Sequence, residues 1–166
     1  MVQTTGEIGS AWERWVCQQL EARGYGAALH RVNNPTVDIR VTARTASFDV
    51  SVKASTGVEQ IRLGRPESIA RLGDRDFVFA ILPVAKGAQL SFLPGGQRLW
   101  IIPGVIARTE GPQPHFDYLS KPGRNGQPRK ASFNVVLKKR GTSPLHAGIW
   151  SRWEAEYQDA WHLLPQ

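Results

Sequence analysis

Hydrophobic and polar residues alternate along this chain with two different periods, which predict the order of its elements. Over residues 6–23 large apolar residues recur every three or four positions, the spacing of a helix with one buried face, and Gly24 follows where such a helix would end. Residues 37–43 and 48–54 alternate every second position and are rich in valine, which predicts a hairpin with a loop of about four residues. We expect a short strand at 27–32 ahead of this hairpin.

The remaining chain continues the mixture of helices and strands. A proline near the start and a glycine at the end predict a short helix over 65–73. The uninterrupted apolar run "DFVFAILP" that follows is typical of a central strand covered on both faces. Further elements are expected in this order: strands at 88–94 and 97–103, a short helical turn in "GVIART", and a strand at 131–139. Last, Trp150, Trp153, Tyr157 and Trp161 are spaced by three and four, which predicts a terminal helix that packs an aromatic stripe against the body.

This order of elements indicates the fold class. A helix, several strands, a helix, more strands and a final helix predict an α/β protein with a mixed central sheet flanked by helices. The chain has 166 residues, of which 41% are hydrophobic and six are tryptophan. That is enough to bury a core of the size usual for one domain, so we expect a single domain over 1–166.

The composition gives evidence on disulfides, membrane segments and the cellular compartment of the protein. The single cysteine, Cys17, excludes an intrachain disulfide and a multi-cysteine zinc site, and its place in the first helical pattern predicts a buried thiol. The N-terminal stretch lacks the pattern of a signal peptide, and there is no run of eighteen apolar residues. We therefore expect a cytoplasmic protein without a membrane partner.

The net charge of +7 is concentrated in one segment. Residues 121–140 hold seven of the 21 bases and none of the 14 acids, so the other residues are neutral overall. The seven bases are Lys121, Arg124, Arg129, Lys130, Lys138, Lys139 and Arg140. Such a patch attracts the phosphates of DNA, duplex or branched, through release of counterions. A solubilising surface loop would have the same composition, so the charge alone leaves both interpretations open.

The hairpin carries the candidate catalytic and metal-binding residues. In a strand, positions 49, 51 and 53 point to one face, so Asp49, Ser51 and Lys53 share that face, and Asp38 on the partner strand is expected at the same open end as Lys53. An acid and a lysine placed together there would suit a divalent cation beside a phosphate. A turn-ending aspartate and a lysine at a strand end would suit a purely structural role, which these residues alone also allow.

Over a longer stretch the sequence resembles a known family. The pattern "GSAWERWVCQQLEARGY … PTVDIRV … FDVSVKAS" is similar to the N-terminal half of the PD-(D/E)xK nuclease superfamily, particularly its restriction-endonuclease-like and archaeal Holliday-junction-resolvase-like branches. Glu13 precedes the pair Gly24 and Tyr25, Asp38 follows "PTV", and Lys53 ends the third element. The resemblance covers about a third of the chain and implies a restriction-endonuclease-like fold.

The resemblance also implies roles for individual residues. Asp38 would be the main ligand of a Mg²⁺ or Mn²⁺ ion, Glu13 an auxiliary ligand, and Lys53 the catalytic lysine. Ser51 stands where the family has a carboxylate or glutamine, and a neutral hydroxyl is a poorer ligand for a hard cation. A carboxylate that migrated from Glu59 or Glu67 would compensate, with Glu67 the better placed because it begins the short helix.

Three functions remain open at this point. The first is a metal-dependent DNA endonuclease that hydrolyses phosphodiester bonds. The second is a catalytically degenerate nuclease fold that binds DNA without cutting it, which the serine favours. The third is a protein-interaction module of the immunity type, whose basic segment would face an acidic partner. A homodimer is compatible with the resemblance, because many enzymes of that fold dimerise to cut both strands.

Overall fold

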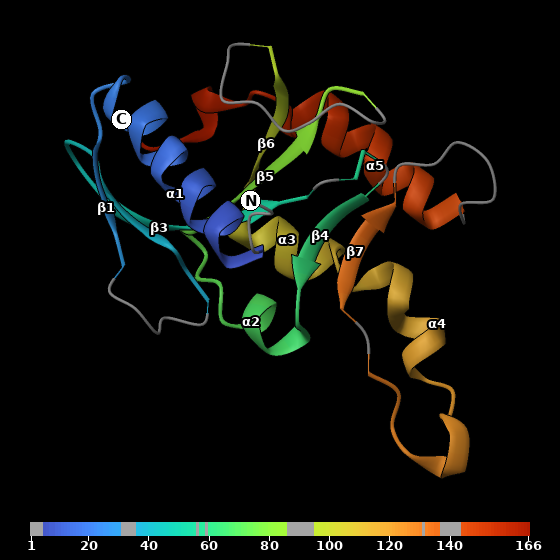
Figure 1. The fold of residues 1–166 in the computed structure, drawn as a ribbon. Coiled ribbons are helices and arrows are strands. Elements are labelled where there is room, and N and C mark those ends of the chain that lie inside the picture. The colour runs from blue at the N-terminus through green and yellow to red at the C-terminus, as the bar shows by residue number, and fades with distance from the viewer. Residues whose placement is uncertain are drawn as a thin grey trace.

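A five-stranded sheet forms the centre of the computed structural model (Figure 1), with the spatial order β1-β2-β3-β5-β6. Its strands are β1 (Gly26–Leu29), β2 (Ile39–Thr42), β3 (Ser47–Ala54), β5 (Phe77–Pro83) and β6 (Gln97–Pro103). The structure describes residues 5–30, 36–55, 57–58, 60–85, 95–130, 132–136 and 144–166. The predicted strand at 88–94 lies outside these residues.

The sheet is mixed, as the order of elements predicted. β2 runs antiparallel to both β1 and β3, β3 and β5 are parallel, and β5 and β6 are antiparallel. The parallel pair follows from the crossover between these two strands, which contains β4 (Gln60–Gly64) and α2 (Pro66–Ala70). The expected hairpin is confirmed, and its register places Ile39 opposite Val50. Every residue of β5 is buried, as expected for a central strand.

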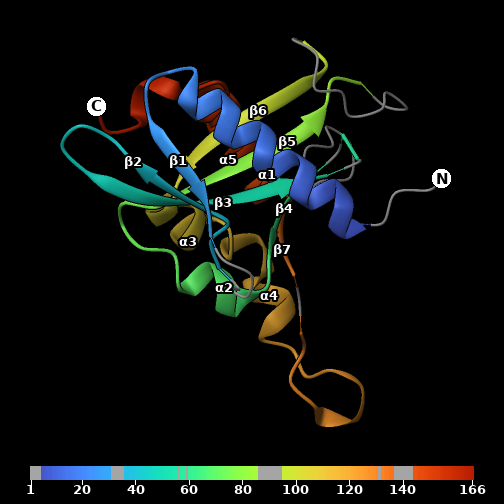
Figure 2. The same cartoon turned by 60° about the vertical axis from the view of Figure 1, so that its left-hand side comes forward.

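One face of the sheet is covered by α1 (Thr5–Glu21), which Figure 2 shows crossing the strands diagonally. Trp12, Val16 and Leu20 from this helix are buried in one cluster with β-strand residues such as Val50 and Phe79. The helical spacing of the apolar residues accounts for this packing, because it brings them to one side of the helix. Cys17 is buried there as predicted, and burial raises the pKa of its thiol.

The opposite face is covered over β5 and β6 by α2, α3 (Gly104–Glu110), α5 (Pro144–Tyr157) and a ribbon of two strands. The ribbon consists of β4 and β7 (Phe133–Val136), which pair with each other in an antiparallel two-stranded sheet. The predicted strand at 131–139 therefore exists, but the part that the structure describes belongs to this ribbon and not to the central sheet.

The terminal aromatic stripe is divided between the two faces, which corrects the prediction of one long helix. Trp153 and Tyr157 pack from α5 into the cluster beneath β5 and β6, but the helix ends at Tyr157. Asp159 then adopts a positive φ of 49°, and its backbone N–H donates to the carbonyl of Leu99. This contact with β6 turns the chain across the sheet edge, so Trp161 packs on the other face, 5.6 Å from the ring centre of Phe79.

A segment between α3 and β7 projects from the body, as Figure 1 shows, and we call residues 116–130 the arm. It contains α4 (Phe116–Leu119) and the short helical turn η2 (Arg124–Gly126), and it follows the turn η1 (Gln113–His115). The base of the arm is closed by the ring of His115, whose Nε2 lies 3.1 Å from the backbone nitrogen of Asn134 in β7. The arm thus leaves and re-enters the body at neighbouring points.

Candidate active site at the open end of the β2–β3 hairpin

Asp38 lies just before β2, at the point where the ladder between β2 and β3 ends. Its backbone is held on both sides, because its N–H donates to Val50 and its carbonyl accepts from His30, each at 2.8 Å. Its side chain reaches across the gap, and Oδ2 accepts a 2.6 Å hydrogen bond from the backbone N–H of Val52. The carboxylate therefore satisfies a backbone donor that a continued ladder would have used. Both of the hydrogen bonds that this carboxylate accepts from the described residues go to Oδ2, and none goes to the other oxygen, Oδ1.

Ser51 is next to this carboxylate. Its side chain is buried, with 1% of the residue exposed, and its hydroxyl donates to Oδ2 of Asp38 across 3.4 Å. At this length the bond is weak compared with the one from Val52. The residue that stands in the place of the family's carboxylate therefore contacts the other acid of the site, as the hairpin register requires.

Glu13 and Lys53 complete the group from two other positions. α1 contacts β3, and Figure 2 shows the N-terminal half of α1 beside the C-terminal end of β3, where Lys53 lies. Partial burial, and then the nearby charge of Asp38, raise the pKa of Glu13, while Lys53 acts in the opposite direction. The three charges are therefore close enough to influence one another, although they come from separate elements.

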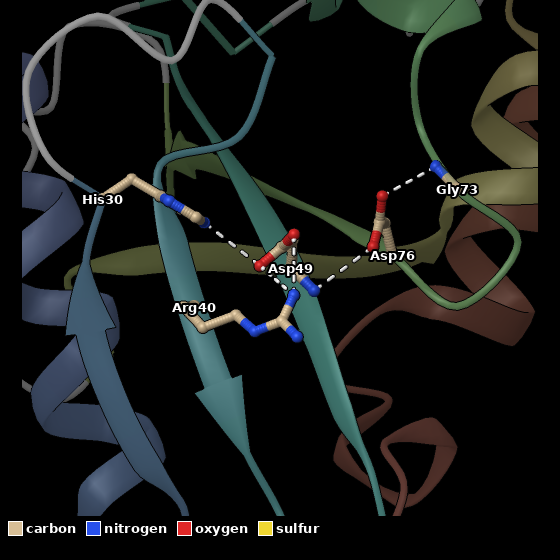
Figure 3. A network of polar contacts seen from close by, with 5 residues as sticks. All are labelled: His30, Arg40, Asp49, Gly73 and Asp76. Carbon is tan, nitrogen blue, oxygen red and sulfur yellow. Dashed lines mark hydrogen bonds and ion pairs between the residues drawn. The ribbon is translucent and has the colours of Figure 1, made fainter.

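Asp49 shares the face of Ser51 but is occupied by other partners (Figure 3). Its carboxylate accepts hydrogen bonds from Arg40, directly opposite on β2, with each oxygen 3.1 Å from Nη1, and His30 Nε2 lies 3.1 Å from Oδ1. The backbone N–H of Asp49 donates to Asp76, which in turn accepts from the N–H of Gly73. Asp49 is thus a structural anchor that joins the hairpin to the loop before β5. The register of the predicted hairpin is enough to predict the pairing of Asp49 with Arg40. Its contacts with His30 and Asp76 cannot be predicted from the sequence and are seen only in the structure.

Of the two candidates for a migrated carboxylate, Glu67 lies away from this group. Glu67 is exposed in the first turn of α2 and faces a groove lined by arginines. Glu59 lies outside the described residues. Within the described ranges no cluster of three or more acids, histidines or cysteines is arranged to hold a metal ion, so Asp38 and Glu13 are the carboxylates that the site offers.

The predicted DNA-binding bases fall into two sets. Lys121, Arg124, Arg129 and Lys130 lie on the arm, and all but Arg129 are exposed. Arg129 is half-buried: its guanidinium lies 4.5 Å from the centre of the Tyr118 ring, and its Nε donates to the carbonyl of Pro122. The second set, Lys138, Lys139 and Arg140, lies outside the described residues. In the part of the chain that the structure describes, no helix is long and apolar enough to cross a bilayer.

The central sheet and its flanking helices define a mixed α/β protein of nuclease-like fold. Among solved structures, the chain is similar to a bacterial homing endonuclease, I-Ssp6803I, with a TM-score of 0.53 and 15% sequence identity. The match covers 98% of this chain and 91% of that one. No family model matches the sequence, and no curated protein does. The likeness shows a shared fold, and membership of the PD-(D/E)xK superfamily stays a prediction.

Proposed function

We propose that this protein is a metal-dependent DNA endonuclease that hydrolyses phosphodiester bonds at the site of Glu13, Asp38 and Lys53. The observation that carries the proposal is the convergence of two carboxylates and a lysine from α1, the start of β2 and the end of β3. The similarity of the fold to that of a homing endonuclease over nearly the whole chain supports it.

The donor atoms fit a hard divalent cation. Mg²⁺ is commonly held by one or two carboxylates and completes its shell with water and substrate phosphate, and Mn²⁺ prefers similar oxygen ligands. Asp38 offers Oδ1, and Glu13 is near enough for the two negative charges to disfavour each other, which a cation would relieve. When bound, the ion would lower the pKa of a coordinated water and so supply a nucleophile at neutral pH.

The other residues of the site act on position and charge. The N–H of Val52 and the hydroxyl of Ser51 hold Oδ2 of Asp38, which fixes the direction of Oδ1. The ammonium group of Lys53 provides the positive charge that stabilises the extra negative charge on the phosphate as it is attacked. Asp49 contributes rigidity to the same strand through its contacts with Arg40 and Asp76.

A second function is favoured by one specific observation, the identity of Ser51. Because this hydroxyl is neutral and is directed to Asp38, the described site has one anionic ligand fewer than the resemblance leads us to expect. A protein that binds DNA through its basic residues and does not cut would retain the same fold. This DNA-binding module is the alternative that an activity measurement must exclude.

Nicking of a supercoiled plasmid with Mg²⁺ or Mn²⁺ separates the two functions. We expect wild-type protein to nick, and Asp38→Asn and Lys53→Ala to lower the rate by about 100-fold or more, with DNA affinity largely kept. Asp49→Asn is the matched control, because it makes the same chemical change at a carboxylate of β3 whose oxygens are held by Arg40 and His30, and it should leave nicking intact. Equal rates for wild type and Asp38→Asn would disprove the proposed active site.

If wild type does not nick, Ser51→Glu distinguishes a degenerate site from an unrelated one. This substitution places a carboxylate two residues before Lys53, on the same face of the strand. Metal-dependent nicking by Ser51→Glu would support a degenerate nuclease whose remaining groups are still arranged for catalysis. Inactivity of both proteins, together with no metal binding, would mean that Asp38 and Lys53 are structural.

A further inference from the structure

A groove of about 730 Å³ lies between α2 and the arm, apart from the candidate active site. One wall comes from the sequence around α2 and includes Arg65 and Arg71, and the other comes from the arm and the residue before β7 and includes Arg129, Lys130 and Ser132. None of the residues Glu13, Asp38 and Lys53 lines it. The groove joins bases that are far apart in the sequence, so the basic segment seen in the sequence is one half of a larger positive surface.

The positive charges of the groove are available to a ligand. Arg65, Arg71 and Lys130 are exposed, and no carboxylate of the described residues forms an ion pair with them. Three arginines elsewhere are paired with carboxylates: Arg40 with Asp49, Arg108 with Asp74, and Arg152 with Glu110. Glu67 is the one acid in the lining, so four bases face a single carboxylate.

The wall from α2 is anchored to the body, and in the other wall Arg129 is held by contacts within the arm. α2 is fixed by Ile69 and the following turn by Leu72, both buried in the cluster beneath the central sheet. On the arm, Arg129 is held by its stack on Tyr118 and by its bond to Pro122. Charges that are positioned before binding lose less conformational entropy when a ligand arrives.

The composition of the lining favours a phosphate chain over an acidic protein. Arginine presents a planar fork that binds phosphate oxygens in pairs, and serine hydroxyls such as that of Ser132 are common phosphate contacts. The centre of a protein interface is depleted in charged residues, whereas here apolar lining is limited to Pro66 and Leu119.

We propose that this groove binds the sugar–phosphate backbone of duplex DNA at a position distinct from the bond to be cut. The inference rests on the proposed function for the identity of the ligand as DNA. The groove contributes affinity and orientation through contacts that do not read the sequence, while the candidate active site performs the chemistry.

Binding without metal tests the groove separately from cleavage. We would measure the fluorescence anisotropy of a labelled duplex of about 30 base pairs over a series of salt concentrations. Two double variants reverse one wall each: Arg65→Glu with Arg71→Glu, and Arg129→Glu with Lys130→Glu. We expect each to weaken binding about tenfold or more and to lower the slope of log K against log salt by about 1 for each lost phosphate contact.

A matched control is Arg44→Glu with Arg75→Glu. Both are exposed bases, and the strand registers place them at the end of the sheet opposite Lys53. This control should bind as wild type does. The milder double variant Arg71→Gln with Lys130→Gln separates loss of binding from loss of folding. It should weaken binding by a smaller factor than the charge reversals do, and its circular dichroism spectrum should equal that of wild type.

The outcomes distinguish this inference from the proposed function. Folded groove variants with the affinity and salt slope of wild type would overturn the proposal that the groove binds DNA, even if the protein nicks DNA. Groove-dependent binding of poly-glutamate as tight as that of the duplex would overturn it in favour of an acidic protein. Loss of binding in both wall variants would support it, even if wild type proves unable to cut.

Discussion

The hydroxyl of Ser51 donates to Oδ2 of Asp38 across 3.4 Å, in a position where less than a tenth of the serine is exposed. The serine is therefore part of the surroundings that orient the acid. The stronger bond to the same oxygen, 2.6 Å from the N–H of Val52, comes from the backbone and survives any substitution of the side chain. Removal of the hydroxyl and addition of a carboxylate should consequently have very different effects.

Ser51→Ala should be mild, whereas Ser51→Glu should be costly in the absence of metal. The alanine variant loses one long hydrogen bond, and we expect the free energy of unfolding to fall by less than about 1 kcal/mol. The glutamate variant places a further negative charge in a confined position beside Asp38 and Glu13, so its melting temperature should fall clearly. Added Mn²⁺ should recover much of that loss, which thermal melts with and without the ion would show. A Ser51→Glu protein as stable as wild type without metal would contradict the close approach of these groups.

Glu13→Gln should stabilise the metal-free protein at neutral pH. Burial and the charge of Asp38 raise the pKa of Glu13 in the folded protein, so ionisation of this group opposes folding once the pH exceeds its ordinary value. The gain in melting temperature over wild type should therefore be present at pH 7 and disappear as the pH falls below about 4, where the carboxyl is protonated in both states. Melting curves across this pH range would check it, with Glu21→Gln on the exposed side of α1 as the control. A gain that persists unchanged in acid would point to packing and not to charge.

Divalent cations should raise the melting temperature of wild type in the absence of DNA. An ion that binds only the folded protein stabilises it by about 2.7 kcal/mol at a hundred times its dissociation constant. Asp38→Asn should lose most of this response, while Asp49→Asn should keep it, because the oxygens of Asp49 are held by Arg40 and His30. Equal responses of the two variants would remove Asp38 from the ligand set.

Trp153→Phe should weaken the fold away from the active site. Trp153 is fully buried, and its indole N–H donates to Oε2 of Glu110 across 2.7 Å. Loss of a hydrogen bond to a charged acceptor costs about 1.5–3 kcal/mol, which denaturant unfolding would resolve. Glu110→Gln keeps an acceptor oxygen and should cost less, since the ion pair of Glu110 with Arg152 is partly exposed. DNA affinity of the folded Trp153→Phe protein should be unchanged.

The hairpin illustrates what the sequence can reveal. Its alternation of valines with polar residues settles which side chains share a face, so the positions of Asp38, Ser51 and Lys53 at one end of two strands follow from the period alone. The position of Glu13 near Asp38 and Lys53 is predicted only from the resemblance. The pattern of a helix does not show which end of which strand its polar face lies against.

Other features depend on contacts between distant segments, and local patterns do not contain them. The end of α5 is determined by the bond from Asp159 to Leu99 in β6, which divides an apparently continuous aromatic stripe. Likewise, β7 has the composition of any strand in the sheet, but its partner is β4. The positive groove arises because this ribbon and α2 bring Arg71 and Lys130 together.

The contact between His115 and Asn134 has a consequence for how such a protein can diverge. Because these residues clasp the two ends of the arm, the intervening segment is an excursion whose length is independent of the central sheet. The entropy of closing a loop grows only slowly with its length, so insertions or deletions there are tolerated at small cost. Descendants of this chain can exchange the arm for a longer, shorter or differently charged one while the carboxylates stay in place. If the proposed function holds, changes in DNA affinity are therefore separable from changes in catalysis during evolution.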